Sequence, residues 1–223
     1  MVSVVIEVGP KQRAFARAVE WPGWCRPGRN EDAALQALDA HRLRYAAVAS
    51  AAGYELPKDG LRVIERVNGT AVTDFGAIAA LSASDQVPLT PAELERLVAL
   101  LEATWMTFDA ALASVPARKQ AVKPQRGRSA AAIRLHILEA ELMHWAGLGG
   151  PAFRKPAEDD VGGRIASARA GLRSALSAAA IGAPAEPRSR YGFRWTPRFV
   201  VHRSAWHALD HAWELENRRA SDV

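Results

Sequence analysis

Cysteine is nearly absent from the sequence, since Cys25 is the only one among 223 residues. Disulfides within the chain are therefore excluded, and a reducing compartment is the natural expectation. No apolar run approaches the roughly 20 residues that a helix needs to cross a bilayer. The segment from Met1 to Glu7 also lacks the basic region and the cleavage site of a secretory signal. We therefore expect a cytoplasmic protein that does not insert into a membrane.

Acidic residues are outnumbered by basic ones, and the 29 Lys and Arg against 24 Asp and Glu give a net charge of +5. A basic chain favours anionic ligands, with nucleic acid among them. The basic residues are, however, spread along the chain. The densest stretch, Arg118 to Arg128, contains Pro124 and Gly127, which is typical of a solvated loop between helices. We therefore do not expect nucleic acid as the main partner.

The first residues alternate in a way that predicts a β-hairpin. Val2 to Val8 is rich in β-branched residues, as strands are, and Gly9-Pro10 is a turn signal. Residues 13–21 then alternate again, which predicts the second strand. Residues 22–29 hold two prolines and two glycines, and this composition predicts a loop.

A helix and a third strand are predicted to follow the hairpin. Asn30 can cap a helix whose apolar positions continue as far as Val48. Leu61 to Val67 has a strand pattern, and Asn68-Gly69 is a turn signal. The expected order of elements is therefore ββαβ over residues 1–82. Residues 83–90 are predicted to be a linker.

Residues 91–223 have a helical pattern throughout. Thr90 and Glu93 form a capping-box pattern with Pro91 at the first helical position. Three further amphipathic patterns begin near residues 129, 159 and 197. The second helix is predicted to end at Gly147, in the left-handed position that often follows a helix. Four helices of this length in sequence predict an all-α bundle, so the expected fold class is α+β.

Five of the six histidines follow residue 135, and three of them form a candidate metal site. His207 and His211 are four residues apart in a helical pattern, which places both imidazoles on one face. His136, in another predicted helix, is the third candidate ligand. Three neutral imidazoles leave coordination positions open for water or substrate, which is typical of a catalytic metal. The alternatives are hydrogen-bonded core histidines and histidines on an open helix face.

Other residues of the sequence have expected roles at or near this site. A carboxylate often holds a metal-binding imidazole in one tautomer, and the candidates by sequence are Glu139, Glu141, Asp210 and Glu214. We expect His144 and His202 on helix surfaces, and His41 as a partly exposed neighbour of Tyr45. Cys25 is expected to be a packed residue rather than a nucleophile, because no histidine stands beside it.

Residues 91–219 resemble the DinB-like superfamily of metal-binding four-helix bundles. That family has one histidine on its second helix and an HxxxH pair on its last, and these correspond here to His136, His207 and His211. The resemblance implies a divalent metal such as zinc, nickel or iron on these ligands. Some members are transferases or isomerases that use a low-molecular-weight thiol such as mycothiol.

Residues 1–80 resemble the N-terminal module of HicB-like antitoxins. The similarity lies in the run from Phe15 to Leu35, where a strand, a Pro-Gly loop and an acidic helix start follow one another. The DNA-binding segment of those antitoxins has no counterpart in this chain. The resemblance therefore implies a module used for interaction or for shaping a site.

Three functions follow as hypotheses. The first is a metal-dependent thiol transferase or isomerase, with a small-molecule electrophile or thiol as its partner. The second is a non-enzymatic binding protein with a structural or vestigial metal. The third is a nucleic-acid-associated regulator. The sequence does not determine the metal, the substrate or the oligomeric state.

Overall fold

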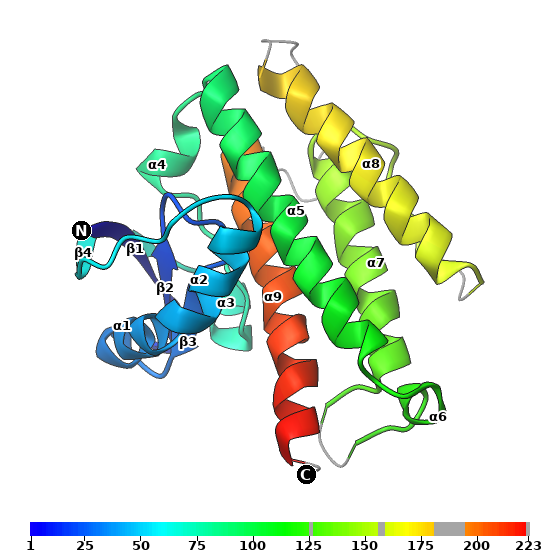
Figure 1. The fold of residues 1–223 in the computed structure, drawn as a ribbon. Coiled ribbons are helices and arrows are strands. Elements are labelled where there is room, and N and C mark those ends of the chain that lie inside the picture. The colour runs from blue at the N-terminus through cyan, green and yellow to red at the C-terminus, as the bar shows by residue number, and fades with distance from the viewer. Residues whose placement is uncertain (125–126, 156–158, 181–194, 222–223) are drawn as a thin grey trace.

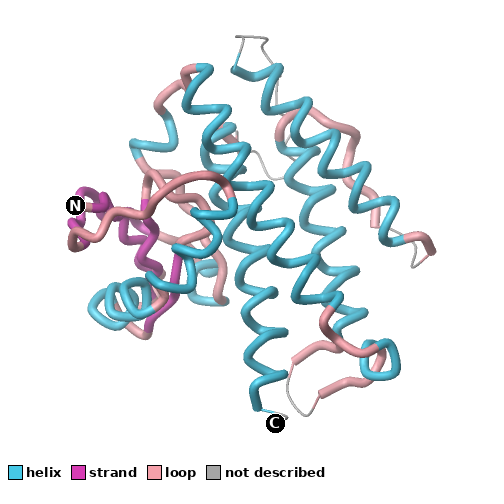
Figure 2. Tube along the Cα trace, viewed as in Figure 1, coloured by secondary structure: helices cyan, strands magenta, loops and turns pink. Residues whose placement is uncertain are grey.

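The computed structural model describes residues 1–124, 127–155, 159–180 and 195–221. It is of the mixed α+β class, with a small four-stranded sheet in the N-terminal part and a helical region after it (Figure 1). Figure 2 shows the strands gathered on one side of the molecule, with helices making up most of the rest. None of the described helices is both long enough and apolar enough to cross a membrane.

The sheet is built around β1 (Val2–Val8), and its strand order is β3-β2-β1-β4. The predicted hairpin is present, because β2 (Ala14–Ala18) pairs with β1 in antiparallel fashion. The predicted third strand is β4 (Leu61–Asn68), and it lies parallel to β1. This parallel pair requires a crossover, which the helices between β3 and β4 supply.

The prediction of a loop over residues 22–29 was wrong in its second half. Cys25–Gly28 forms the strand β3, which pairs with β2. Its Pro27 cannot donate a ladder hydrogen bond, but β3 is an edge strand, where proline is tolerated. Local composition therefore concealed a strand that depends on its neighbour.

The predicted N-terminal helix is present but broken in two. Asn30 caps α1 (Glu31–Ala40), since its side chain accepts a hydrogen bond from the Ala33 amide. The chain leaves helical geometry at His41 and continues as α2 (Arg42–Ala51). The Nδ1 atom of His41 lies 2.8 Å from the Ala37 carbonyl oxygen, and this contact supports the break.

The stretch expected to be a linker is tied to the sheet. Two short helices, α3 (Ala71–Phe75) and α4 (Ala83–Gln86), lie between β4 and the long helices. Asp85 of α4 is buried and forms an ion pair with Arg17 of β2 at 2.7 Å. This segment therefore covers one face of the sheet.

The four long helices predicted for the second half are present. They are α5 (Pro91–Ala113), α7 (Ala130–Gly147), α8 (Val161–Ala180) and α9 (Pro197–Ser221), with the short helix α6 (Ala117–Gln120) between the first two. Figure 1 shows α5 beside α9 and α7 beside α8. The predicted capping box of Thr90 and Glu93 is confirmed.

The second long helix ends at Gly147 as predicted, but Gly147 is not the left-handed residue that follows the helix. Gly147 is still helical, Leu148 caps the helix, and Gly149 takes the left-handed conformation with φ of 89°. Position 147 favours glycine for a different reason, because a Cβ there would lie 2.9 Å from the ring of Trp195.

Helix α9 lies between the sheet and the other long helices. On its sheet side, the ring of Trp206 packs edge-on against Phe15, with centroids 5.7 Å apart. Gly23 approaches Leu209 and Ala205 so closely that a Cβ would lie 2.8 Å from the Leu209 side chain. On its opposite side α9 contacts α7. One helix therefore connects the N-terminal part with the region that holds the candidate ligands.

Candidate metal centre

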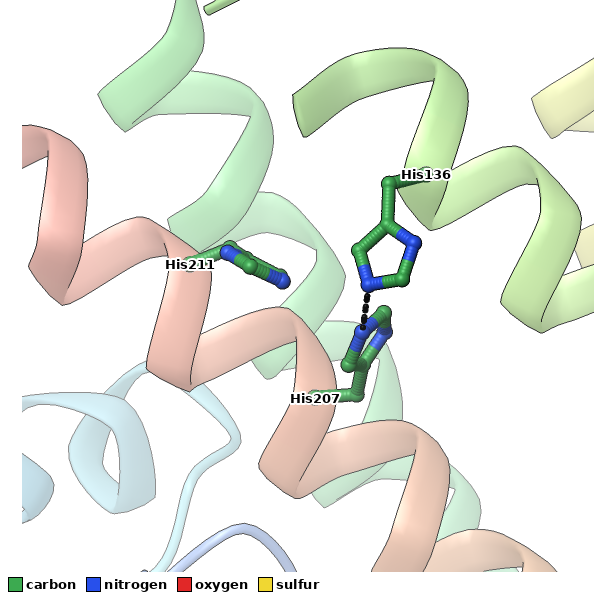
Figure 3. A group of neighbouring side chains, drawn as sticks. All are labelled: His136, His207 and His211. Atoms are coloured by element: carbon green, nitrogen blue, oxygen red, sulfur yellow. Dashed lines mark hydrogen bonds between the residues drawn. The ribbon is translucent and has the colours of Figure 1, made fainter. Parts of the chain in front are cut away.

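The structure brings the three predicted ligands together between α7 and α9. His136 projects from α7, and His207 and His211 project from successive turns of α9 (Figure 3). One ring nitrogen of each residue lies within 4.8 Å of the others. The two Nε2 atoms of His136 and His207 are 3.0 Å apart. One of these two atoms must then carry a proton that the other accepts, or both must face a shared cation.

The three imidazole nitrogens could bind one divalent metal ion after a small change in their positions. Imidazole nitrogens bind zinc at about 2.0–2.1 Å, so two ligands of one ion lie at most about 4.2 Å apart. The 3.0 Å between His136 and His207 is within that limit. The widest spacing of 4.8 Å must shrink by about 0.6 Å. Small side-chain rotations are enough for such a change.

Glu214 orients His211 for this role. Its Oε2 lies 2.8 Å from Nδ1 of His211, three residues earlier on α9. The hydrogen bond places the proton on Nδ1 and leaves Nε2 as a lone-pair donor. In Figure 3 that outer nitrogen points toward His136 and His207. His211 first, and then Arg218, lowers the pKa of the Glu214 carboxyl, and Arg218 also hydrogen-bonds it directly.

The other three candidate carboxylates have different surroundings. Asp210 forms an ion pair with Arg26 at 3.1 Å, on the side of α9 that faces the N-terminal part. Glu141 is buried and forms an ion pair with Arg169 at 3.1 Å. Glu139 is half-buried, and within the described residues no hydrogen bond joins it to the three histidines.

The surroundings keep two of the imidazoles neutral. Burial first, and then the neighbouring His211 and Arg128, lower the pKa of His136 to about 4. Burial, followed by His211 and His136, lowers the pKa of His207 well below its usual range. A neutral imidazole is the form that binds a metal. Protons therefore do not compete for these two nitrogens near neutral pH.

A loop residue also packs against this site. Gly127 has φ of 90°, which favours glycine, and a Cβ there would lie 2.5 Å from a guanidinium nitrogen of Arg218. Arg218 in turn donates a hydrogen bond to the Arg128 carbonyl at 2.6 Å. This arrangement could not be predicted from the sequence, because a glycine between basic residues has the composition of an ordinary loop.

The prediction of surface positions for His144 and His202 was wrong. Each side chain is only 1% exposed. His144 packs against Trp195, with ring centroids 5.7 Å apart, and His202 lies near the Arg17–Asp85 ion pair. Both helix faces look open from the sequence alone, but other parts of the chain cover them.

Two further residues have the surroundings that the sequence suggested. His41 is half-buried, although its ring partner is Trp213, with centroids 5.3 Å apart. Cys25 is buried, and burial strongly raises the pKa of its thiol. A protonated and inaccessible thiol does not act as a nucleophile, so Cys25 is a packing residue.

Two hollows on the described surface are lined by residues other than the three histidines. One, of ≈ 560 Å³, lies between α2 and residues 53–58. The other, of ≈ 400 Å³, lies among α5, α7 and α8 beside Arg134 and Arg169.

A scan against models of known protein families found no match, and searches of curated proteins and of solved structures found none either.

Proposed function

We propose that the chain is an enzyme that depends on a divalent metal bound by His136, His207 and His211. The observation that carries the proposal is the convergence of three imidazole nitrogens within 4.8 Å, from two helices that are far apart in sequence. The low pKa of His136 and the Glu214 hydrogen bond to His211 supply what such a ligand set needs.

The chemistry follows from the ligand types. Zinc, nickel or iron on three neutral imidazoles would keep positions open, and there it would lower the pKa of a bound thiol or water or polarise a carbonyl group. Glu214 holds the proton of His211 at Nδ1, so that Nε2 faces the site. The reaction class that we favour is thiol-dependent transfer or isomerisation, with a small electrophile and a thiol such as mycothiol as partners.

The first experiment is elemental analysis of the purified protein, with the wild type beside His207→Ala. We expect about one metal ion per chain in the wild type and a large loss in the variant. His41→Ala is the matched control, because it also removes one histidine but lies outside the ligand set. Absence of metal after incubation with zinc, nickel and iron salts, or equal binding by His207→Ala, would contradict the proposal.

A second candidate function is that of a binding protein with no catalytic metal. The observation in its favour is the ≈ 560 Å³ hollow on α2, which is separate from the three histidines and is bordered by the exposed Leu43. If such a protein binds no metal, the wild type and His207→Ala would have the same metal content.

A further inference from the structure

The hollow of ≈ 400 Å³ among α5, α7 and α8 has the size and the lining of a small-molecule site. Its apolar or small lining residues are Leu112, Ala113, Gly162, Ile165 and Ala166, and its polar ones are Asp109, Gln120, Arg134 and Arg169. Sites for small molecules typically have a volume of about 300–1,000 Å³ and combine apolar walls with a few polar groups. The hollow is therefore large enough for a small molecule that carries charged groups.

One charge at the hollow is the carboxylate of Asp109, whose position is fixed from behind. Nη1 of Arg169 donates a hydrogen bond to Oδ2 of Asp109 at 2.6 Å. Arg169 is itself held by the buried Glu141, which accepts hydrogen bonds from its Nε, and by the ring of Trp105, whose centroid lies 5.2 Å from the guanidinium carbon. Within the described residues no hydrogen bond reaches the other oxygen of Asp109, Oδ1. That oxygen is left for a donor on a ligand.

The second charge at the hollow is the guanidinium of Arg134, which projects from α7. Within the described part of the chain it forms no hydrogen bond and no ion pair. Its Nη2 lies against the first turn of α8, where a Cβ on Gly162 would be only 2.4 Å away. The amides at the start of a helix carry partial positive charge, so this is an unfavourable place for a cation. Asp160 accepts a hydrogen bond from the Gly163 amide in this turn but forms no ion pair with Arg134.

The two charges line the same hollow without pairing with each other. Arg169 has the buried Glu141 as its own counter-charge, so the charges left at the hollow are one guanidinium and one carboxylate. A ligand of either net charge would satisfy only one of them, whereas a zwitterion would satisfy both. In addition, Nη2 of Arg169 is buried and has no hydrogen-bond partner among the described residues. Buried polar groups normally have such a partner, and a ligand oxygen would supply it.

We propose that this hollow binds a free α-amino acid with an apolar side chain, with Arg134 at its carboxylate and Asp109 at its ammonium group. The planar guanidinium suits a carboxylate, because it donates two parallel hydrogen bonds. Leu112 and Ile165 line the hollow beside these charges and contact the apolar side chain. The site is separate from the three histidines, so the inference goes beyond the proposed metal-dependent function and does not depend on it.

The test uses the full chain after removal of metal with a chelator, because amino acids themselves bind metal ions. Norleucine is the probe. Its matched analogues are hexanoate, which lacks the ammonium group, and pentylamine, which lacks the carboxylate. The NMR signals of the Leu112 and Ile165 methyl groups report on binding in the hollow. Burial raises the pKa of Glu141 to about 7, so the titrations are made at pH 8, where this carboxylate is ionised.

We expect norleucine to shift the signals of both residues, and each analogue to bind at least about tenfold more weakly. Unchanged methyl signals, or an analogue that binds as tightly as norleucine, would overturn the proposal. Because no metal is present, either outcome leaves the elemental analysis of the three-histidine site unaffected.

Variants of the two charged residues test each end of the ligand separately. Arg134→Gln should weaken norleucine binding by about tenfold or more and leave pentylamine binding unchanged, because pentylamine has no carboxylate. Asp109→Asn should weaken norleucine binding similarly and leave hexanoate binding unchanged. The matched control is Arg173→Gln, because this exposed arginine of α8 pairs with Glu102 and does not line the hollow. Norleucine affinity equal to the wild type in either variant would overturn the proposal.

A variant that fills the hollow tests the site without changing any charge. Ala166 is exposed and lines the hollow, so Ala166→Leu should abolish the methyl shifts without disturbing the core. The control is Ala170→Leu, since Ala170 is exposed on the same helix but does not line the hollow. Norleucine binding by Ala166→Leu as tight as by Ala170→Leu would show that the amino acid binds elsewhere, and the proposal would be wrong.

Discussion

Arg17 and Asp85 form a two-pronged ion pair in the interior, although they are 68 positions apart in the sequence. The Nη1–Oδ1 and Nη2–Oδ2 distances are 2.8 Å and 2.7 Å. Burial alone would raise the pKa of Asp85, but the hydrogen bonds and charge of Arg17 lower it to about 2. This pair fastens α4 to the sheet, on the side where α9 also packs.

Breaking this pair should be strongly destabilising. Asp85→Asn leaves the Arg17 guanidinium buried beside a neutral group, and we expect a loss of about 3–5 kcal/mol in the free energy of unfolding. Urea denaturation followed by tryptophan fluorescence measures this loss.

A surface pair supplies the control for that experiment. Arg66 and Glu31 also form a two-pronged pair, but the Arg66 side chain is 61% exposed. Glu31→Gln should therefore cost much less than Asp85→Asn, because water already solvates the charges of this pair. Similar losses in the two variants would show that burial of the Arg17–Asp85 pair is energetically unimportant.

Stability should fall on acidification, in part because of His202. Burial first, and then the charge of Arg17, lower the pKa of His202 from 6.5 to about 3, while Asp85 acts in the opposite direction. Between those two values the unfolded chain binds a proton that the folded chain does not bind. Stability is therefore greatest above pH 6.5 and decreases as the pH falls toward 3.

The variant His202→Gln isolates this contribution, because its amide does not titrate. In metal-free protein we expect the variant to lose less unfolding free energy than the wild type between pH 7 and pH 4. The difference in slope should be up to about 1.4 kcal/mol per pH unit. Parallel pH profiles of the two proteins would rule out His202 as the source.

Features that depend on neighbouring residues were predictable from the sequence. The Asn30 cap, the Thr90–Glu93 capping box and the β1–β2 hairpin each need only residues close in the chain, and all three are present. The His207–His211 pair follows the same logic, since a helix places i and i+4 on one face. The helical pattern around His136 also correctly predicted that this residue lies on the second long helix.

Features that depend on long-range contacts were not predictable. Strand β3 forms because β2 lies beside it, and the burial of His202 depends on the sheet covering α9. Predicting the role of Glu214 requires knowing the direction in which its side chain points, and a single sequence does not give this direction.

Glu214 should control metal affinity without binding the metal. Glu214→Gln removes the carboxylate that holds the proton of His211 on Nδ1, and we expect about 10–100-fold weaker binding. Competition with a chelator of known affinity measures the change. The matched control is Glu216→Gln on the same helix, because Glu216 pairs with Arg44 at 2.6 Å. Equal affinity in both variants would mean that the His211 tautomer does not limit binding.

Gly23 should be essential to the contact between the sheet and α9. Its φ is 92°, and a Cβ would lie 2.8 Å from the Leu209 side chain and 3.3 Å from Ala205. Gly23→Ala therefore combines backbone strain with a steric clash, and we expect it to cost more than about 1 kcal/mol.

Gly53→Ala separates the two contributions. Gly53 has φ of 82°, and nothing lies within 4 Å of the position of its Cβ. Gly53→Ala therefore has the backbone strain without a clash. The difference between the unfolding free energies lost in Gly23→Ala and in Gly53→Ala measures the clash with α9. Urea denaturation of both variants gives that difference. If Gly23→Ala costs no more than Gly53→Ala, the loop at Gly23 moves away from α9 easily, and the sheet does not hold the helix that carries His207 and His211.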